Sequence, residues 1–175
     1  MKKIGFGIVI LVVLVFYACR PHPGERVEVY DTANHSFRIR VSRYAERNGG
    51  LVPGAYYVFQ SAPLNSEKWR DIMTFRHDDP NPIPRDQIRF VNDNVGYVFM
   101  GWMYAVTTDG GASWAVWDAQ QDLPKWQCCN YRLIGDVKLA ADGLGTMTLN
   151  PIPERSGEVP QLYTRDYSRH WYAER

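Results

Sequence analysis

Residues 107–114, TTDGGASW, bring a carboxylate, hydroxyl groups and two glycines together between apolar runs. This combination is compatible with a catalytic loop, a phosphate-binding loop, a ligand-binding turn or a structural turn. A P-loop is not expected, because the segment lacks the lysine and the helix of that motif. Asp109 can instead accept hydrogen bonds from the backbone of its own turn, and Gly110 and Gly111 allow positive φ. The pattern therefore favours a structural turn.

His77-Asp78-Asp79 is the one cluster of titratable residues that suggests catalysis or cation binding. Adjacent residues of an extended chain point to opposite sides, so these side chains do not converge by themselves. The sequence also lacks the GxSxG, HExxH and spaced Cys/His motifs of hydrolases and metal sites. We therefore predict no catalytic residue, no metal and no cofactor. A small hydrolase remains an alternative, because paired carboxylates can come from distant strands.

The N-terminus has the pattern of an export signal, with two lysines ahead of an uncharged apolar run. The run is shorter than the roughly 20 residues of a membrane-spanning helix and fits a signal-peptide core, so residues 1–18 are predicted to be the signal peptide. Ala18-Cys19 resembles the lipobox of bacterial lipoproteins, which implies a lipid on Cys19. Because Arg20 follows, the resemblance further implies sorting to the outer membrane, facing the periplasm. An inner-membrane anchor is the alternative.

Residues 19–25 contain two prolines and predict a short lipidated tether ahead of a single domain, residues 26–175. Two further cysteines, Cys128 and Cys129, are adjacent. In an oxidising compartment they can form a disulfide, but neighbouring Cα atoms lie only about 3.8 Å apart, which strains such a bond. Both a disulfide and two free thiols remain open.

The charge balance is nearly even, with 20 Lys and Arg residues against 19 Asp and Glu residues. It provides no basic surplus for nucleic-acid binding, so no nucleic-acid partner is expected. The hydrophobic fraction of 45% and the aromatic fraction of 14% indicate a folded domain rather than a disordered chain.

Internal similarity divides the chain into three units. Residues 87–100 and 136–149 align at an offset of 49 residues, and each alternates apolar and polar residues around a short turn, as β-hairpins do. The segment 107–114 recurs at 164–171, at an offset of 57 residues. A weaker copy of this unit precedes both.

The repeats predict four strands in each unit and no long helix. The expected strands are 26–30, 37–42, 55–61 and 69–75, then 87–91, 96–101, 103–107 and 113–117, and finally 136–140, 146–149, 161–164 and a short strand at Trp171. Any short helix is expected in the loops 77–84 and 119–130. The predicted fold class is all-β, with three antiparallel β-meander units in an incomplete propeller-like or sandwich-like stack.

The pattern Thr107-x-Asp109-x-Gly111-x-x-Trp114 resembles the Asp-box, a turn between the outer strands of blades in sialidases and other β-propeller proteins. In that family the box is structural and lies away from the catalytic face. The resemblance therefore assigns structural turn roles to Thr107, Asp109, Gly111, Trp114, Asp166 and Trp171. Propellers close with about 4–8 blades, so three units predict an open stack, or a ring completed by a homodimer.

Exposed aromatic and arginine side chains are the expected binding groups, because they desolvate a large area with few rotamers. Trp102 and Trp117 are expected in the core between sheets. The loops 46–54 and 154–160 occupy corresponding positions in their units. The residues predicted to contact a partner are Trp126, Tyr131, Arg47 and Arg155.

Small exported lipoproteins of this β-sheet character resemble immunity proteins that neutralise lipase effectors of type VI secretion systems. The resemblance implies a non-enzymatic protein that binds one protein partner, a secreted effector, and is held at the membrane by its N-terminal lipid. A cell-surface glycan-binding module with exposed tryptophans, or a small hydrolase, is the alternative.

Overall fold

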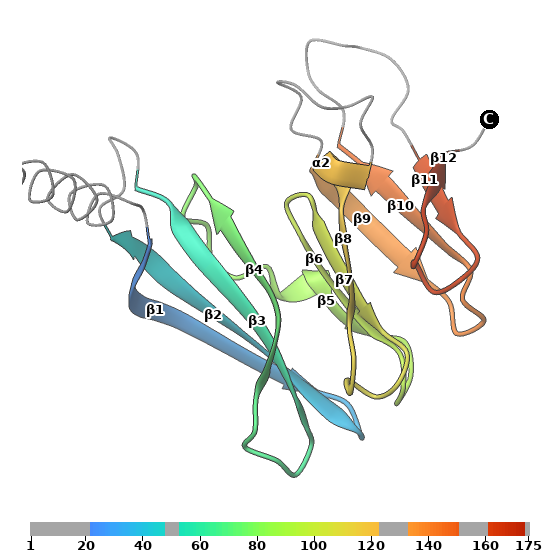
Figure 1. The fold of residues 1–175 in the computed structure, drawn as a ribbon, viewed down its shortest axis with the longest axis horizontal. Helices are drawn as coiled ribbons and strands as arrows, with labels where there is room; N and C mark the ends of the chain where they lie inside the picture. Colours follow the sequence, from blue (N-terminus) through green and yellow to red (C-terminus); the bar gives the residue numbers. More distant parts are fainter. Residues whose placement is uncertain (1–21, 48–52, 123–132, 151–160, 174–175) are drawn as a thin grey trace, which may run out of the picture.

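Three four-stranded antiparallel sheets make up the fold (Figure 1). The structure is a computed structural model that describes residues 22–47, 53–122, 133–150 and 161–173. The first sheet contains β1 (His22–Ala33), β2 (Phe37–Arg47), β3 (Ala55–Pro63) and β4 (Arg70–His77). The second contains β5 (Ile88–Phe90), β6 (Gly96–Met100), β7 (Met103–Thr107) and β8 (Ala115–Asp118). The third contains β9 (Ile134–Leu139), β10 (Gly145–Leu149), β11 (Gln161–Thr164) and β12 (Tyr172–Ala173).

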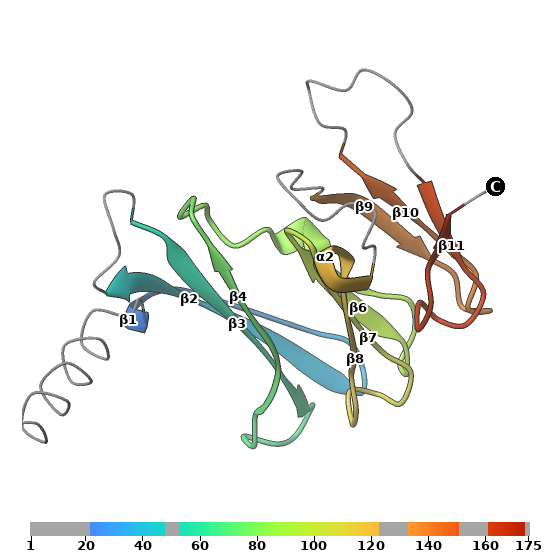
Figure 2. The same ribbon diagram turned by 45° about the horizontal axis from the view of Figure 1, so that its top comes forward.

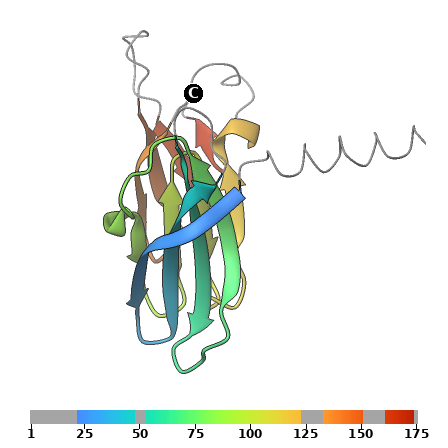
Figure 3. The same ribbon diagram turned by 90° about the vertical axis from the view of Figure 1, so that its left-hand side faces the viewer.

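Each sheet is a meander in which strands adjacent in the sequence are hydrogen-bonded neighbours. The sheets follow one another as successive layers, with the second between the other two (Figure 2). Viewed end-on, the first sheet lies in front of the others (Figure 3). The predicted fold class, an all-β open stack of three antiparallel meander units, is confirmed.

The N-terminal strand differs from its predicted extent. β1 begins at His22, inside the segment predicted to be a tether, because His22 pairs with Arg47 and extends the ladder with β2. Pro23 is compatible with this position, since β1 is the edge strand of its sheet and the ladder shifts register just after it. Residues 22–25, predicted to belong to the tether, are therefore part of the first sheet.

Two short helical segments accompany the strands in the described part of the chain. The 3-10 helix η1 covers Arg85–Gln87, and α2 covers Ala119–Asp122, within the loop where a short helix was expected. No helix among the described residues is long and apolar enough to cross a membrane. The predicted signal peptide and Cys19 lie outside the described residues.

Alternation along the first part of β2 separates the two faces of the first sheet. In β2, Phe37, Ile39 and Val41 are fully buried toward the second sheet, whereas Arg38 and Arg40 are partly exposed on the other face. This period of two is what a half-buried strand requires.

The buried side chains form one core layer on each side of the second sheet. The first layer lies between the first and second sheets and includes Phe37, Tyr57, Phe59, Phe75, Ile88 and Val98. The second lies between the second and third sheets and includes Tyr97, Phe99, Tyr104, Val137, Met147 and Leu162. Trp117 is buried in the second layer, and Trp102 packs against both. The second sheet is therefore covered on both faces, and the outer sheets each leave one face open.

Candidate functional site

The turn at 107–114 connects β7 and β8 and uses its carboxylate internally. Asp109 accepts hydrogen bonds from Thr107 Oγ1 at 2.8 Å and from the Ser113 backbone N–H at 2.9 Å, and a further bond from Ser113 Oγ. The Gly111 N–H donates to Thr107 Oγ1 at 3.0 Å. Gly110 and Gly111 have φ of +67° and +81°, which explains the need for glycine.

The turn at 164–171 connects β11 and β12 and repeats this network. Asp166 accepts hydrogen bonds from Thr164 Oγ1 at 2.9 Å and from the His170 backbone N–H at 3.1 Å, and it pairs with the His170 ring. The Ser168 N–H donates to Thr164 Oγ1 at 2.9 Å. The two carboxylates are therefore engaged in closing their own turns.

Opposing effects set the pKa of Asp109. Burial alone would raise it, but the hydrogen bonds from Ser113 and Thr107 outweigh burial, so the pKa lies below its usual value. The pKa of Asp166 is lowered in the same way, with His170 as the main hydrogen-bonding partner against burial. Both carboxylates are thus held ionised, as turn acceptors need to be.

The His77-Asp78-Asp79 cluster does not converge. His77 Nδ1 accepts a hydrogen bond from the Asp79 backbone N–H at 2.9 Å, whereas Asp78 forms an ion pair with Arg76 at 2.7 Å. Among the residues that the structure describes, no group of three His, Cys, Asp or Glu side chains is arranged to hold a metal ion.

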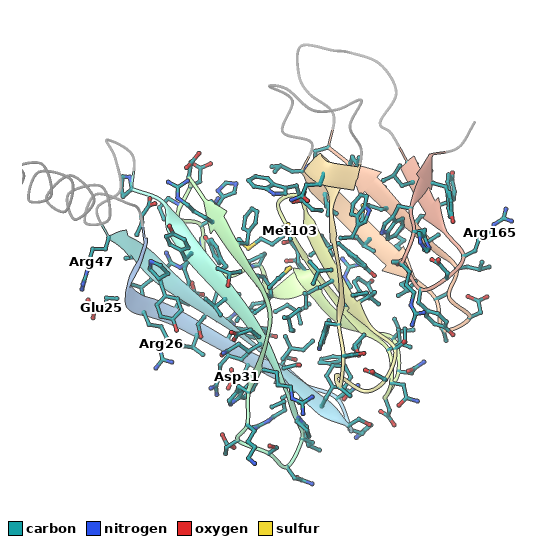
Figure 4. The ribbon with its side chains drawn as sticks, viewed as in Figure 1. Glu25, Arg26, Asp31, Arg47, Met103 and Arg165 are labelled. Atoms are coloured by element: carbon teal, nitrogen blue, oxygen red, sulfur yellow. The ribbon has the colours of Figure 1, made fainter. Side chains whose placement is uncertain are left out.

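Of the residues predicted to contact a partner, Arg47 lies in the described part of the chain. It ends β2 and is exposed at the first sheet, at the opposite end of the stack from Arg165 of the third sheet (Figure 4). The others, Trp126, Tyr131 and Arg155, lie outside the described residues, as do Cys128 and Cys129.

The open face of the first sheet is occupied by its own side chains. The guanidinium groups of Arg38 and Arg40 lie 4.8 and 4.0 Å from the ring centroid of Trp69. Arg40 also forms an ion pair with Asp31 at 2.7 Å, and Arg38 with Glu67 at 3.1 Å. These arginines already have anionic and aromatic partners within the sheet.

The open face of the third sheet carries a row of four side chains across its strands. Lys138 of β9 is opposite Thr146 of β10, Thr146 is opposite Tyr163 of β11, and Tyr163 is opposite Tyr172 of β12. Directly opposed residues of neighbouring strands share a face of the sheet. Tyr172 is 56% exposed, which is unusual for a large aromatic side chain on a sheet.

This row runs into a groove of about 930 Å³ at the end of the third sheet where the turns lie. Leu144, at the β9–β10 turn, contributes an apolar wall and is 51% exposed. In addition to Lys138, Arg165 contributes a second cation to the lining; it is next in sequence to Asp166, whose carboxylate is engaged in its own turn. Within the described residues neither cation forms an ion pair. The groove thus combines exposed apolar groups with two available cations.

Tyr167 braces the β9–β10 turn, which carries Leu144 of the groove. Its hydroxyl donates to the Ala141 carbonyl at 2.9 Å, its backbone N–H donates to the Gly143 carbonyl at 3.1 Å, and its ring packs on Gly143. A tyrosine at φ +57° is strained, and the equivalent position in the second unit is Gly110. Strain of this kind persists where the surrounding structure enforces it, often at functional sites.

A second hollow, of about 770 Å³, lies between the turns of the second and third sheets. Its lining mixes polar and apolar groups and includes Asn92, Asp93, Tyr167, Arg169 and His170. His170 is already engaged by Asp166. This hollow lacks the exposed large apolar side chains that mark the groove on the third sheet.

Sequence reasoning did not find the groove, although the repeat contained a signal for it. The offsets that align the second and third units place Lys138 at the position of Arg89 and Tyr172 at that of Ala115.

Comparison with protein-family models, with curated proteins and with solved structures finds no match for the chain.

Proposed function

We propose that this chain is an exported, lipid-anchored binding protein that acts by stoichiometric association with one protein partner rather than by catalysis. The groove on the open face of the third sheet is the observation that carries the proposal. Leu144 and Tyr172 are about half exposed there, next to cations that lack an ion pair among the described residues. Exposed apolar groups clustered with cations are typical of protein-binding surfaces.

The partner class proposed is a secreted toxic effector of the lipase type, with this chain as its immunity protein. A rigid sheet suits that role, because a preorganised surface loses little conformational entropy on binding. The three core-packed sheets provide such a scaffold.

The glycan-binding alternative draws less support from the described tryptophans. Trp69 lies against Arg38 and Arg40, and Trp114 packs on the first sheet. Trp102, Trp117 and Trp171 contribute to the core layers. These rings are engaged in packing rather than presented as platforms for sugars.

Affinity capture after chemical crosslinking in the cell envelope tests the proposed function. The full chain, tagged at its C-terminus, should recover one protein in stoichiometric amount, and that protein should lose phospholipid hydrolysis when one equivalent of this chain is added. Recovery of glycans without a protein would favour the glycan-binding alternative and contradict the proposal.

A further inference from the structure

The second and third units use equivalent rows of residues in different ways. In the second unit the row is Arg89, Tyr97, Val106 and Ala115, each opposite the next across the four strands. In the third unit the row is Lys138, Thr146, Tyr163 and Tyr172. In the first row Tyr97 and Val106 are buried against the third sheet, Arg89 is half-buried and Ala115 is exposed. The second row lies on the open face.

The row of the second unit shows what its cation binds. Arg89 donates to the Val137 carbonyl at 2.8 Å and forms an ion pair with Asp136 at 2.9 Å, so it holds the extended strand β9 by a carbonyl and a carboxylate. Tyr97 donates to the same carbonyl at 2.9 Å. A cation at this point of the repeat therefore binds the neighbouring extended chain.

Lys138 occupies the same place in the third unit, which no further sheet covers among the residues that the structure describes. Its ammonium group has no ion-pair partner among the described residues, and Arg165 lines the same groove. A charge without a partner on a sheet face favours an anionic ligand group. In the third unit the cation of the repeat is therefore present, but the carboxylate that pairs with Arg89 in the second unit has no counterpart among the ion pairs of the described residues.

The remaining positions of the open face argue against a whole fourth sheet. Three positions of the open face are polar where the second unit is aromatic. In the alignment of the two units, Thr146 corresponds to Tyr97, Thr148 to Phe99 and Gln161 to Tyr104. Those aromatic residues fill the second core layer. A polar outer face is typical of a terminal repeat that needs no further unit. Leu144, Tyr163 and Tyr172 contribute large apolar groups to the groove near the turns.

We propose that the groove of the third sheet binds an extended segment of the partner protein in which a carboxylate lies beside an apolar side chain. Lys138 and Arg165 bind the carboxylate, and Leu144 and Tyr172 contact the apolar side chain. This inference rests on the proposed function and names the chemistry of the partner at that surface. It assigns to Lys138 the role that Arg89 has inside the stack.

Panning of a phage-displayed library of random linear 12-residue peptides on the full chain in detergent micelles tests this inference. The expected peptides combine Asp or Glu with an aromatic or branched aliphatic residue. Leu144→Ser and Lys138→Glu should each weaken their binding at least about tenfold, as the loss of a central contact does. Replacing the acidic residues of a synthetic copy by Lys should abolish its binding.

Two control variants match these changes away from the groove. Val116→Ser removes an apolar side chain of similar exposure, 46%, from β8, and Lys68→Glu reverses an exposed charge between β3 and β4. Both should leave peptide binding unchanged. All four variants should keep the thermal unfolding temperature of the parent chain, which separates lost binding from lost folding.

Several results would overturn the inference. The first two are that no peptide is enriched or that basic peptides are enriched. The third is that the Leu144→Ser variant binds the selected peptides as well as the parent chain does. The fourth is that the chain forms a dimer which the Leu144→Ser substitution dissociates, because the groove would then bind a second copy of the chain. If envelope capture recovers a protein that the groove variants also bind, the groove assignment fails while the proposed function stands. If peptides bind the groove but no envelope protein is captured, the proposed function fails instead.

Discussion

At the scale of single residues, Asp109 and Asp166 have the same task in two different turns. Each accepts hydrogen bonds from the threonine two positions before it and from the backbone four positions after it. A residue type that often serves catalysis is used here to fix the path of the backbone. The glycine that follows Asp109 is replaced in the other turn by Tyr167, which accepts a strained φ and braces the β9–β10 turn.

Asp109→Ala should lower the free energy of unfolding by about 1–3 kcal/mol, because it frees the Ser113 N–H and the Thr107 hydroxyl from their acceptor. Urea denaturation measures this change. Affinity for the captured partner should be unchanged under conditions where the variant is folded, since the turn lies in the second sheet. Full stability combined with lost binding would show that Asp109 belongs to a binding site.

Asp109→Asn should change how stability depends on pH. The pKa of Asp109 is lower in the folded than in the unfolded chain, so its ionised form stabilises the fold at neutral pH. That contribution is lost as the pH falls below about 4. The difference in melting temperature between the parent and the Asn variant should be constant above about pH 5 and shrink below pH 4. A difference that grows on acidification would contradict the assigned pKa shift.

At the scale of secondary-structure elements, local patterning predicted most strands of the three sheets. The alternation of apolar and polar residues in Phe37–Val41 indicates a strand with one buried face. The turns of the repeat hairpins indicate where one strand ends and the next, antiparallel strand begins. The extension of β1 to His22 was missed, because it depends on pairing with Arg47, a contact between distant positions. The prolines near His22 are also typical of a short, stiff tether, which is how this segment was interpreted.

The groove was harder to predict than the strands. Tyr172 and Trp171 are neighbouring aromatic residues, yet one is 56% exposed and the other 8% exposed. Which of the two faces solvent follows from the position of the third sheet, which is covered on one face only in the described part of the chain. That property belongs to the arrangement of the sheets and not to any segment. The alignment of Lys138 with Arg89 across the repeat was a signal for the groove, but it was used only to define the repeat.

Trp171→Ala should destabilise the chain by about 3–5 kcal/mol, because the ring fills space against Tyr104 and Trp117 in the second core layer. Tyr172→Ala should cost within about 0.5 kcal/mol, since its ring is on the open face. Differential scanning calorimetry of the two neighbouring variants measures the contrast. Equal losses would mean that the open face is covered in the native protein.

At the scale of the whole molecule, the two ends of the stack differ. The described chain begins in the first sheet, whose open face has its arginines engaged by Trp69, Asp31 and Glu67. The groove lies on the third sheet, at the other end (Figure 1). In the proposed arrangement the lipid on Cys19 holds the first sheet near the membrane. The groove is then presented away from the attached end.

Cys19→Ser should move the protein from the membrane fraction to the soluble periplasmic fraction or leave it with an uncleaved leader, because the lipid is proposed to be attached at this thiol. Metabolic labelling with a fatty acid, followed by mass spectrometry of the N-terminal peptide, reports both outcomes. A labelled protein that persists in the Cys19→Ser variant would exclude this residue as the site of lipidation.

The central claim, stoichiometric binding of one protein through the open face of the third sheet, is tested most directly by the mass of the complex in solution. Light scattering coupled to size-exclusion chromatography measures that mass for the full chain in detergent with the captured envelope protein. The predicted result is a one-to-one complex that forms with the parent chain and with Val116→Ser but not with Leu144→Ser. A complex of unchanged mass with Leu144→Ser, or none with the parent chain, would contradict it.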